Sequence, residues 1–125
     1  MKLLLDSHAY LWWLEDDSRL SAEAGRTIAD PTNVVFVSAA TIWELEIKRA
    51  LGRLEVEDSD LVAEIAANEF GELPVRAAHA AAAARLPAHH SDPFDRMLIA
   101  QAHSEGLVCV TTNPLFEQYG VATVW

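Results

Sequence analysis

Residues His90 to Ala102 read His-Ser-Asp-Pro-Phe-Asp-Arg-Met-Leu-Ile-Ala-Gln-Ala, which is a sharp turn followed by the start of a helix. Asp92 suits the N-cap position, Pro93 suits the first helical position, and Asp95 falls in the first turn. Apolar residues follow at helical spacing, and Gly106 is a typical C-terminal stop. We therefore expect two carboxylates at the positive end of one helix, either as a cap with a second favourable acid or as part of a larger acidic site.

The composition indicates a folded protein. The chain has 125 residues, of which 51% are apolar, and this is enough for a domain with a hydrophobic core. No apolar run is long enough to span a bilayer, and the short run after Met1 ends at Asp6 without a signal-peptide cleavage site. Cys109 is the single cysteine and lies in an apolar run, so we expect a core thiol, no disulfide and a cytoplasmic location.

The formal net charge of −10 limits the ways in which this protein can bind nucleic acid. A broad phosphate-binding surface is normally basic, so an acidic chain is unusual for such a role. Two explanations stay open at this point. The acids are concentrated where cations bind, or an acidic surface faces a basic partner protein.

Strands and helices alternate along the chain, which is typical of α/β proteins with a parallel sheet covered by helices on both faces. No repeat or linker divides the chain, so we expect one domain over residues 1–125. The predicted strands span residues 2–6, 34–38, 107–111 and 121–125, with a short extended segment at 73–75. The predicted helices span residues 7–15, 20–29, 40–51, 76–86, 93–105 and 115–119, and a further helix ends at Glu69 after a cap at Asp58 or Ser59.

The helix predicted at 40–51 carries an apolar stripe, which is good evidence for a helix. Glu44 lies beside this stripe and forms an i,i+4 pair with Lys48, so a solvated surface acid is one interpretation of it. The members of the stripe are Trp43, Ile47, Ala50, Leu51 and Leu54.

The remaining aromatic and histidine side chains have ordinary packing roles as the simpler interpretation. We expect Trp12, Trp13 and Trp43 in the core or at a dimer interface. We interpret His89 and His90 as loop residues rather than as ligands of a softer metal.

Several polar residues fall where the ends of parallel strands meet. Asp6 ends the first strand, Glu44 lies early in the helix after the second, and Asn113 follows the third. Ligands in such sheets bind at the carboxyl ends of the strands, and helix N-termini such as that of Asp92 and Asp95 lie at the same edge. Each residue also has a simpler interpretation, because Asp6 can be a helix cap and Asn113 a turn residue.

The coincidence of acids favours a bound cation. Three carboxylates about 5 Å apart repel by roughly 3 kcal/mol per pair at an effective dielectric constant near 20, which exceeds what one helix cap contributes. Without a counter-ion such a cluster is destabilising, or one acid takes up a proton. Oxygen ligands in this number suit Mg²⁺ or Mn²⁺, which also bind phosphate oxygens.

Four segments in this order resemble the motifs of PIN domains, and more narrowly those of VapC-type ribonuclease toxins of toxin–antitoxin pairs. The match covers almost the whole chain, and its third segment is the most specific. The segments are Leu4-Leu5-Asp6-Ser7-His8 with Trp12-Trp13, the run Ser-Ala-Ala-Thr-Ile-Trp-Glu-Leu-Glu-Ile-Lys from Ser38 to Lys48, the run from His90 to Ala102, and Thr111-Thr112-Asn113.

The resemblance implies a single PIN domain over residues 1–125, with a three-layer α/β/α fold around a mainly parallel sheet. It also implies a type II toxin that is a metal-dependent endoribonuclease, forms a homodimer and is inhibited by a VapB-like antitoxin. DNA would be contacted only through the antitoxin, and no membrane is involved. The alternative from another class is a non-catalytic PIN scaffold that acts only by binding protein or RNA.

Carried over by position, Asp6, Glu44 and Asp95 match the catalytic acids of the family and would hold Mg²⁺ or Mn²⁺. Asp92 is a fourth metal ligand or a residue that supports the ligands. Asn113 stands where many relatives have an acid, which leaves the number of metal ions open. The candidates that orient water or a ligand carboxylate are Ser7, Thr111 and Asn113.

The implied reaction is metal-assisted hydrolysis of an RNA phosphodiester. The cation polarises the phosphate and lowers the pKa of the attacking water, and Glu44 or Asp95 orients that water or accepts its proton. The candidate contacts to flanking phosphates are Lys48, Arg49, Arg53 and Arg96, for which ordinary surface charge is the alternative.

Overall fold

The protein is described by a computed structural model that covers residues 1–54 and 59–125. The strands are β1 (Lys2–Leu5), β2 (Val34–Ser38), β3 (Gly71–Leu73), β4 (Val108–Val110) and β5 (Thr123–Val124). The helices are α1 (Ser7–Leu14), α2 (Ala22–Ala29), α3 (Ala39–Ala50), α4 (Leu61–Ala67), α5 (Ala77–Arg85), α6 (Pro93–Glu105) and α7 (Leu115–Gln118).

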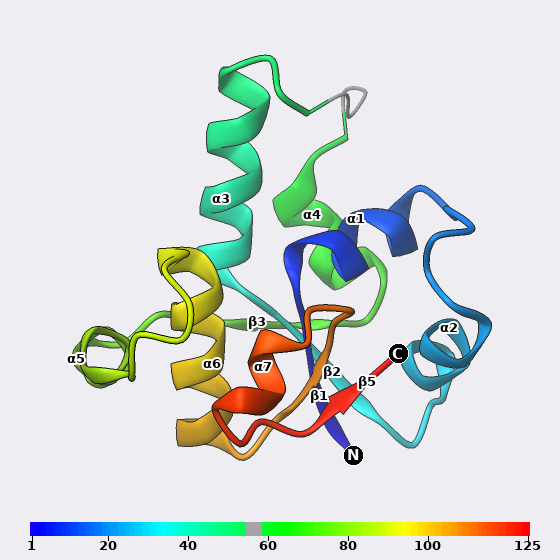
Figure 1. Cartoon of the computed structure of the whole chain (residues 1–125). Coiled ribbons are helices and arrows are strands. Elements are labelled where there is room, and N and C mark those ends of the chain that lie inside the picture. The colour runs from blue at the N-terminus through cyan, green and yellow to red at the C-terminus, as the bar shows by residue number, and fades with distance from the viewer. Residues whose placement is uncertain (55–58) are drawn as a thin grey trace.

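The strands form one parallel sheet in the order β3-β2-β1-β4-β5, and helices lie on both of its faces (Figure 1). The predicted α/β/α architecture with a parallel sheet is therefore confirmed. The strand order changes direction between β1 and β4, because β2 and β3 follow on one side of β1 and β4 and β5 on the other. The carboxyl edge at such a switch point is where open α/β sheets bind ligands.

Alternation along β1 divides the hydrophobic core into two layers. Leu3 and Leu5 are fully buried in the cluster that includes residues of α1, α2 and α4. Leu4 points to the opposite face and packs in the cluster that includes residues of α6 and α7. Each such leucine stabilises the fold by about 1.5–3 kcal/mol. The core therefore holds β1 at the centre of the sheet, and with it the residue that follows.

Two local predictions shift in the structure. The extended segment predicted at 73–75 lies instead at Gly71–Leu73, because Pro74 cannot donate a ladder hydrogen bond and ends the strand. The cap of α4 is Asp60, whose Oδ1 accepts from the amides of Val62 and Ala63 at 3.1 Å. Ser59 is therefore not the cap, and Asp58, the other predicted cap, lies outside the described residues.

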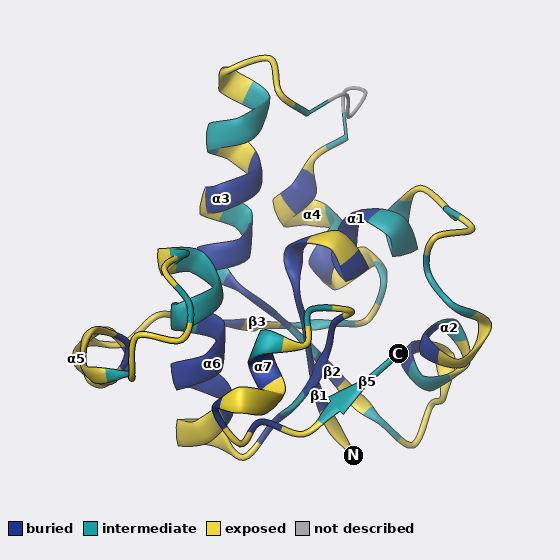
Figure 2. Cartoon of the chain, in the orientation of Figure 1, coloured by how far each residue is buried: buried dark blue, intermediate teal, exposed yellow. Residues whose placement is uncertain are grey.

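Part of the apolar stripe of α3 lies outside the core, which leaves a dimer interface as the remaining prediction for Trp43. Trp43 is 65% exposed and Leu51 is 61% exposed. The buried face of α3 is instead formed by Ala40, Thr41, Glu44 and Leu45. The C-terminal half of α3 projects beyond the sheet, where its turns are exposed or half-buried (Figure 2). Helical periodicity predicts an apolar face, but it does not say whether the same chain or another molecule buries that face.

The position of the single cysteine agrees with the sequence. Cys109 is 1% exposed in the core of the sheet, as predicted. None of the helices in the described part of the chain combines the length and the apolar character that crossing a bilayer would need.

Candidate metal centre

Asp6 occupies the central position of the site because β1 ends directly before it. Its side chain caps α1, with Oδ1 accepting from the Ala9 amide at 2.8 Å, and its own amide donates to the Val110 carbonyl at 3.2 Å. Only 7% of the residue is exposed. The cap interpretation from the sequence is correct, but it places a carboxylate at the switch point of the sheet.

Glu44 reaches the same edge from the second turn of α3. The residue is only 6% exposed, so the interpretation as a solvated surface acid is wrong. The Ser7 hydroxyl donates a short hydrogen bond to Oε1 of Glu44, and Lys48 Nζ lies 2.9 Å from Oε2. Because Ser7 follows Asp6 in the chain, this contact ties α3 to the end of β1.

Asp92 and Asp95 occupy the first turn of α6, as the sequence predicts. Asp92 Oδ1 accepts from the amides of Phe94 and Asp95 at 2.8 and 3.2 Å, so this carboxylate caps the helix. Asp95 is half-buried, and its Oδ2 lies 2.8 Å from Nε2 of His90.

A buried polar link, which sequence reasoning missed, connects the helices that carry these acids. The Ser38 hydroxyl accepts from the Ala40 amide at the start of α3 and donates to Oε1 of Gln101 in α6 at 2.7 Å. Both Ser38 and Gln101 are fully buried. A glutamine inside the apolar run Leu98–Ala102 was the available signal, because a buried amide needs a partner.

The charges of these acids influence one another in pairs. Burial raises the pKa of Asp6, the Thr111 hydroxyl lowers it by hydrogen bonding, and the charge of Glu44 adds to the rise. Burial also raises the pKa of Asp95; the hydrogen bond from His90 lowers it, and the charges of Asp92 and Glu44 raise it further. The charge of Glu44 therefore acts on both Asp6 and Asp95, and the charge of Asp92 acts on Asp95.

The donor set fits a hard divalent cation, since the gathered oxygens are carboxylates. Thr41 supplies an independent observation. It lies three residues before Glu44 and is 1% exposed, and among the described residues its Oγ1 has no hydrogen-bond partner. Residues three apart share a helix face, so water or an ion near Glu44 can satisfy this oxygen. As the side chains stand, no three acidic, histidine or cysteine residues in 1–54 and 59–125 enclose a metal position.

Asn113 lies in the turn after β4 and is committed to it. Its Oδ1 accepts from the Leu115 amide at 3.0 Å, and its amide donates to Thr111 Oγ1 at 3.0 Å. Thr111 and Asn113 line a cavity of about 460 Å³ together with Glu23, Glu117 and Trp125. The turn interpretation of Asn113 therefore describes its contacts, while Thr111 faces both this turn and Asp6.

The basic residues predicted to contact RNA phosphates differ in the hydrogen bonds and ion pairs that they already make. Arg96 donates to four backbone carbonyls, those of Ala83, Leu86, Pro87 and His90, so it braces the segment before α6 and is occupied. Arg49 donates to the Ser59 carbonyl at 2.9 Å and pairs with Glu46. Lys48 contacts Glu44, and Arg53 is exposed.

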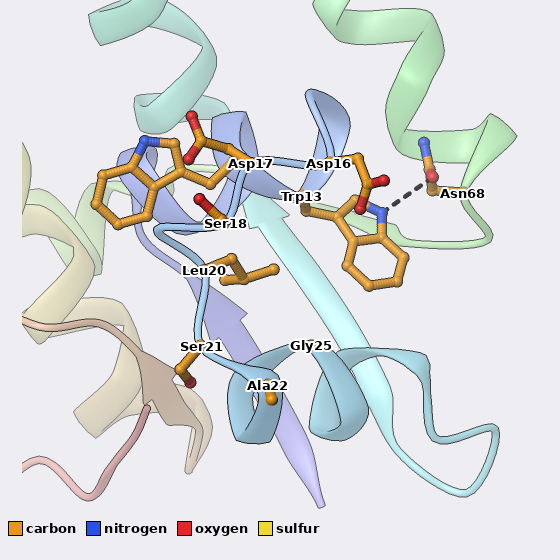
Figure 3. Close-up of a pocket in the computed structure, with 10 residues that line it drawn as sticks. Trp13, Asp16, Asp17, Ser18, Leu20, Ser21, Ala22, Gly25 and Asn68 are labelled. Atoms are coloured by element: carbon orange, nitrogen blue, oxygen red, sulfur yellow. Dashed lines mark hydrogen bonds between the residues drawn. The ribbon is translucent and has the colours of Figure 1, made fainter.

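A separate cavity of about 610 Å³ lies at the C-terminal end of α1, whereas Asp6 caps the opposite end (Figure 3). Trp12, Trp13 and Leu20 supply apolar walls, and Asp16 and Asp17 lie at the α1–α2 connection. Trp13 Nε1 donates to Oδ1 of Asn68 at 3.0 Å, which joins α1 to the end of α4. Trp12 and Trp13 are half-buried, which leaves apolar surface open to a ligand here.

The fold and the site together define an α/β/α protein with a carboxylate site at the switch point of a parallel sheet. The chain belongs to the PIN domain family, whose model matches residues 3–122. PIN domains are generally nucleases and typically use divalent metals. A search of curated proteins finds no match.

Solved structures with the same fold include components of toxin–antitoxin complexes. VapBC2 from Rickettsia felis, bound to a promoter DNA fragment, matches with a TM-score of 0.72 and 12% identity over 99% of this chain and 98% of that one. FitAcB from Neisseria gonorrhoeae matches with a TM-score of 0.61 and 20% identity, over 98% of this chain and 96% of that one. VapBC-1 from nontypeable Haemophilus influenzae matches with a TM-score of 0.60 and 18% identity, over 99% of this chain and 97% of that one. At these identities the likeness concerns the fold.

We predict that Asp6→Asn stabilises the metal-free protein at neutral pH. Burial disfavours the charged form of Asp6, and asparagine keeps an oxygen for the Ala9 amide. A raised pKa in the folded state means that stability is retained below about pH 4 and lost as the pH rises through that pKa. The advantage of the variant, measured by urea unfolding in EDTA, should therefore widen from about pH 4 to 7. A difference in unfolding free energy between variant and wild type that is the same at every pH would contradict a raised pKa for Asp6.

We also predict that Mn²⁺ stabilises the wild type but not Asp6→Asn. A ligand at about 100 times its Kd stabilises a protein by about 2.7 kcal/mol, which is on the order of 10 °C in Tm for a domain of this size. Thermal melts with and without Mn²⁺ measure the difference. Equal shifts in both proteins would place the cation elsewhere.

Proposed function

We propose that the protein is a Mg²⁺- or Mn²⁺-dependent endoribonuclease and the toxin component of a type II toxin–antitoxin pair of the VapC type. The observation that carries this proposal is the placement of Asp6 directly after β1, with buried Glu44 tied to the neighbouring Ser7 and its charge raising the pKa of both Asp6 and Asp95. Membership in the PIN family and the VapBC and FitAB neighbours support it. An RNA substrate and the lack of a membrane-spanning helix in the described residues fit a cytoplasmic location.

In this mechanism Asp6, Glu44 and Asp95 hold the cation, and Asp92 fixes the first turn of α6 from which Asp95 projects. A divalent cation held by these residues would supply Lewis-acid polarisation of the scissile phosphate and of the attacking water. Glu44 or Asp95 would accept a proton from the attacking water as its oxygen forms a bond to phosphorus, and the leaving oxygen would take a proton from solvent water as its bond to phosphorus breaks. Ser7 keeps the Glu44 carboxylate turned toward Asp6 through its hydrogen bond.

The distribution of positive charge indicates how RNA approaches an acidic protein. Three of the nine lysine and arginine residues, Lys48, Arg49 and Arg53, lie within six positions at the C-terminal end of α3. We propose that phosphates flanking the cut contact this end of α3. Arg96 is excluded from that role as long as it holds its four carbonyls.

We propose a VapB-like antitoxin as the protein partner, with DNA contacted only through it. The net charge of −10 and the acidic edge suit a partner segment with basic residues. The cavity of Figure 3 offers apolar walls next to Asp16 and Asp17, so an apolar and basic segment of the antitoxin fits there. Because α1 connects this cavity to Asp6, a tail leaving it can reach the acids and cover them.

We propose that a second copy of the chain covers the exposed face of α3. Trp43 and Phe94 pack edge to face with ring centroids 5.3 Å apart, and they line a cavity of about 400 Å³. All of its lining residues are apolar: Ala39, Ala40, Trp43, Val75, Pro93, Phe94 and Met97. A patch without charges is the part of a strongly acidic chain that another copy can approach, and large exposed apolar patches mark interfaces. Homodimerisation would thus bring two acidic sites close together.

A non-catalytic PIN scaffold is the second candidate. Asn113 stands where many relatives have an acid, and its side-chain oxygen is already used by the Leu115 amide. A weaker or single metal site would follow, and the protein would then act through binding alone. Activity of the purified protein decides between the two.

We predict that the purified, antitoxin-free protein cleaves RNA only with Mg²⁺ or Mn²⁺, and that Asp95→Asn loses on the order of 10³-fold in rate. Removing a carboxylate that holds the ion removes several kcal/mol of charge stabilisation. The measurement is cleavage of a defined RNA pool, followed by mapping of the product ends.

The matched control is Glu72→Gln, which neutralises an exposed acid on β3. It should cleave at the wild-type rate. Equal rates for wild type and Asp95→Asn would reject the catalytic assignment, and an inactive wild type would favour the scaffold.

We predict that Trp43→Glu converts the protein from a dimer to a monomer. Light scattering should give twice the 13.8 kDa chain mass for the wild type and a single chain mass for the variant. Val62→Glu is the control, because Val62 is 55% exposed on α4, outside the lining of the Trp43 cavity. A wild-type monomer, or a dimer that survives Trp43→Glu, would remove α3 from the interface.

A further inference from the structure

His90 lies before α6 and contacts one of the acids directly. Its Nε2 is 2.8 Å from Oδ2 of Asp95, and the two side chains are 16% and 21% exposed. Sequence reasoning treated this histidine as an ordinary loop residue. An ordinary loop side chain would have no reason to be held against a partly buried carboxylate, so the surroundings of His90 decide its role.

The backbone of His90 is held by hydrogen bonds to Tyr119, 29 positions away, and to Arg96 in α6. Its amide donates to the Tyr119 hydroxyl at 2.8 Å, and its carbonyl accepts from Nη1 of Arg96 at 3.0 Å. Tyr119 in turn donates to the Pro87 carbonyl at 2.6 Å, and Arg96 donates to Pro87 as well. Tyr119 is only 9% exposed. These hydrogen bonds therefore hold the backbone of the segment before α6, from which the His90 imidazole reaches Asp95.

The hydrogen bond leaves a defined part of Asp95 available. A carboxylate only accepts, so Nε2 of His90 carries the donated hydrogen. Oδ2 is thus held by the imidazole, while no other described side chain or amide donates to Oδ1 of Asp95. Carboxylates that hold metal ions are commonly oriented by such outer hydrogen bonds, and removing one costs about 10- to 100-fold in metal affinity.

We propose that His90 is a positioning residue that orients the Asp95 carboxylate for the divalent cation, with Tyr119 and Arg96 holding His90 in place. This rests on the proposed function, because it presumes that Asp95 binds the cation. His90 acts through Asp95 and touches neither the ion nor the substrate. Its imidazole limits the rotation of the carboxylate, so less order has to be imposed when the ion arrives.

The test is the affinity for Mn²⁺ alone, measured by isothermal titration calorimetry without RNA. His90→Ala should weaken Mn²⁺ binding by about 10- to 100-fold. His90→Gln places an amide N–H close to the position of Nε2, so it should recover affinity to within about threefold of the wild type. Recovery by a non-titrating amide would show that Mn²⁺ binding needs an N–H donor to Asp95 and not an imidazole ring.

Two further variants separate the hydrogen bond from the packing of the loop. His89→Ala is the matched control: its ring lies 5.2 Å from that of Tyr119, and the described residues include no carboxylate partner for it. This variant should bind Mn²⁺ as the wild type does. Tyr119→Phe removes the hydroxyl that holds Pro87 and His90, and it should weaken binding by less than His90→Ala.

The outcomes are distinguishable. A wild type that does not bind Mn²⁺ overturns the proposed function and this inference with it. A wild type that binds, with His90→Ala equal or tighter, overturns the positioning role alone, and tighter binding would mark His90 as a competitor of the ion. Equal losses in His89→Ala and His90→Ala would assign the effect to loop packing and contradict the proposal. Circular dichroism melts check folding, and if His90→Ala is unfolded, unchanged affinity in Tyr119→Phe overturns the proposal.

Discussion

Carboxylates repel one another most strongly where water is excluded, and this protein gathers them at such a place. Asp6 and Glu44 are each less than a tenth exposed, and the charge of Glu44 acts on both Asp6 and Asp95. A protein that needed only helix caps would have no reason to bury these charges together. Several of the surrounding contacts hold these charged groups in place, and the proposed cation would make the arrangement favourable.

Two kinds of contact hold the acids in place: helix caps within one segment, and a few side-chain hydrogen bonds between segments far apart in the sequence. Helix dipoles and amides stabilise Asp6 and Asp92 as caps. Ser7 links the end of β1 to α3, and Ser38 with Gln101 links α3 to α6. Three helices and one strand are thereby locked into one edge. The site is consequently set by the sheet and not by flexible loops, which suits chemistry that depends on position.

The predictable part of the molecule was the part governed by local rules. The caps Asp6 and Asp92, the apolar strands and the strand–helix alternation follow from neighbouring residues, so the fold and the edge at which the acids meet could be derived. The stripe of Trp43 and Leu51 has the helical period of a core face, but period alone does not distinguish a core from an interface. The contacts of His90 depend on Tyr119, 29 positions away, and no local pattern encodes such a pair.

The central claim is that separate segments deliver their oxygens to one divalent ion. Anomalous diffraction from crystals soaked in MnCl₂ tests it most directly, because it locates the ion without reference to activity. The account predicts a manganese peak among the carboxylates of Asp6, Glu44 and Asp95. A crystal with manganese bound only elsewhere, or with these carboxylates empty at saturating Mn²⁺, would contradict it.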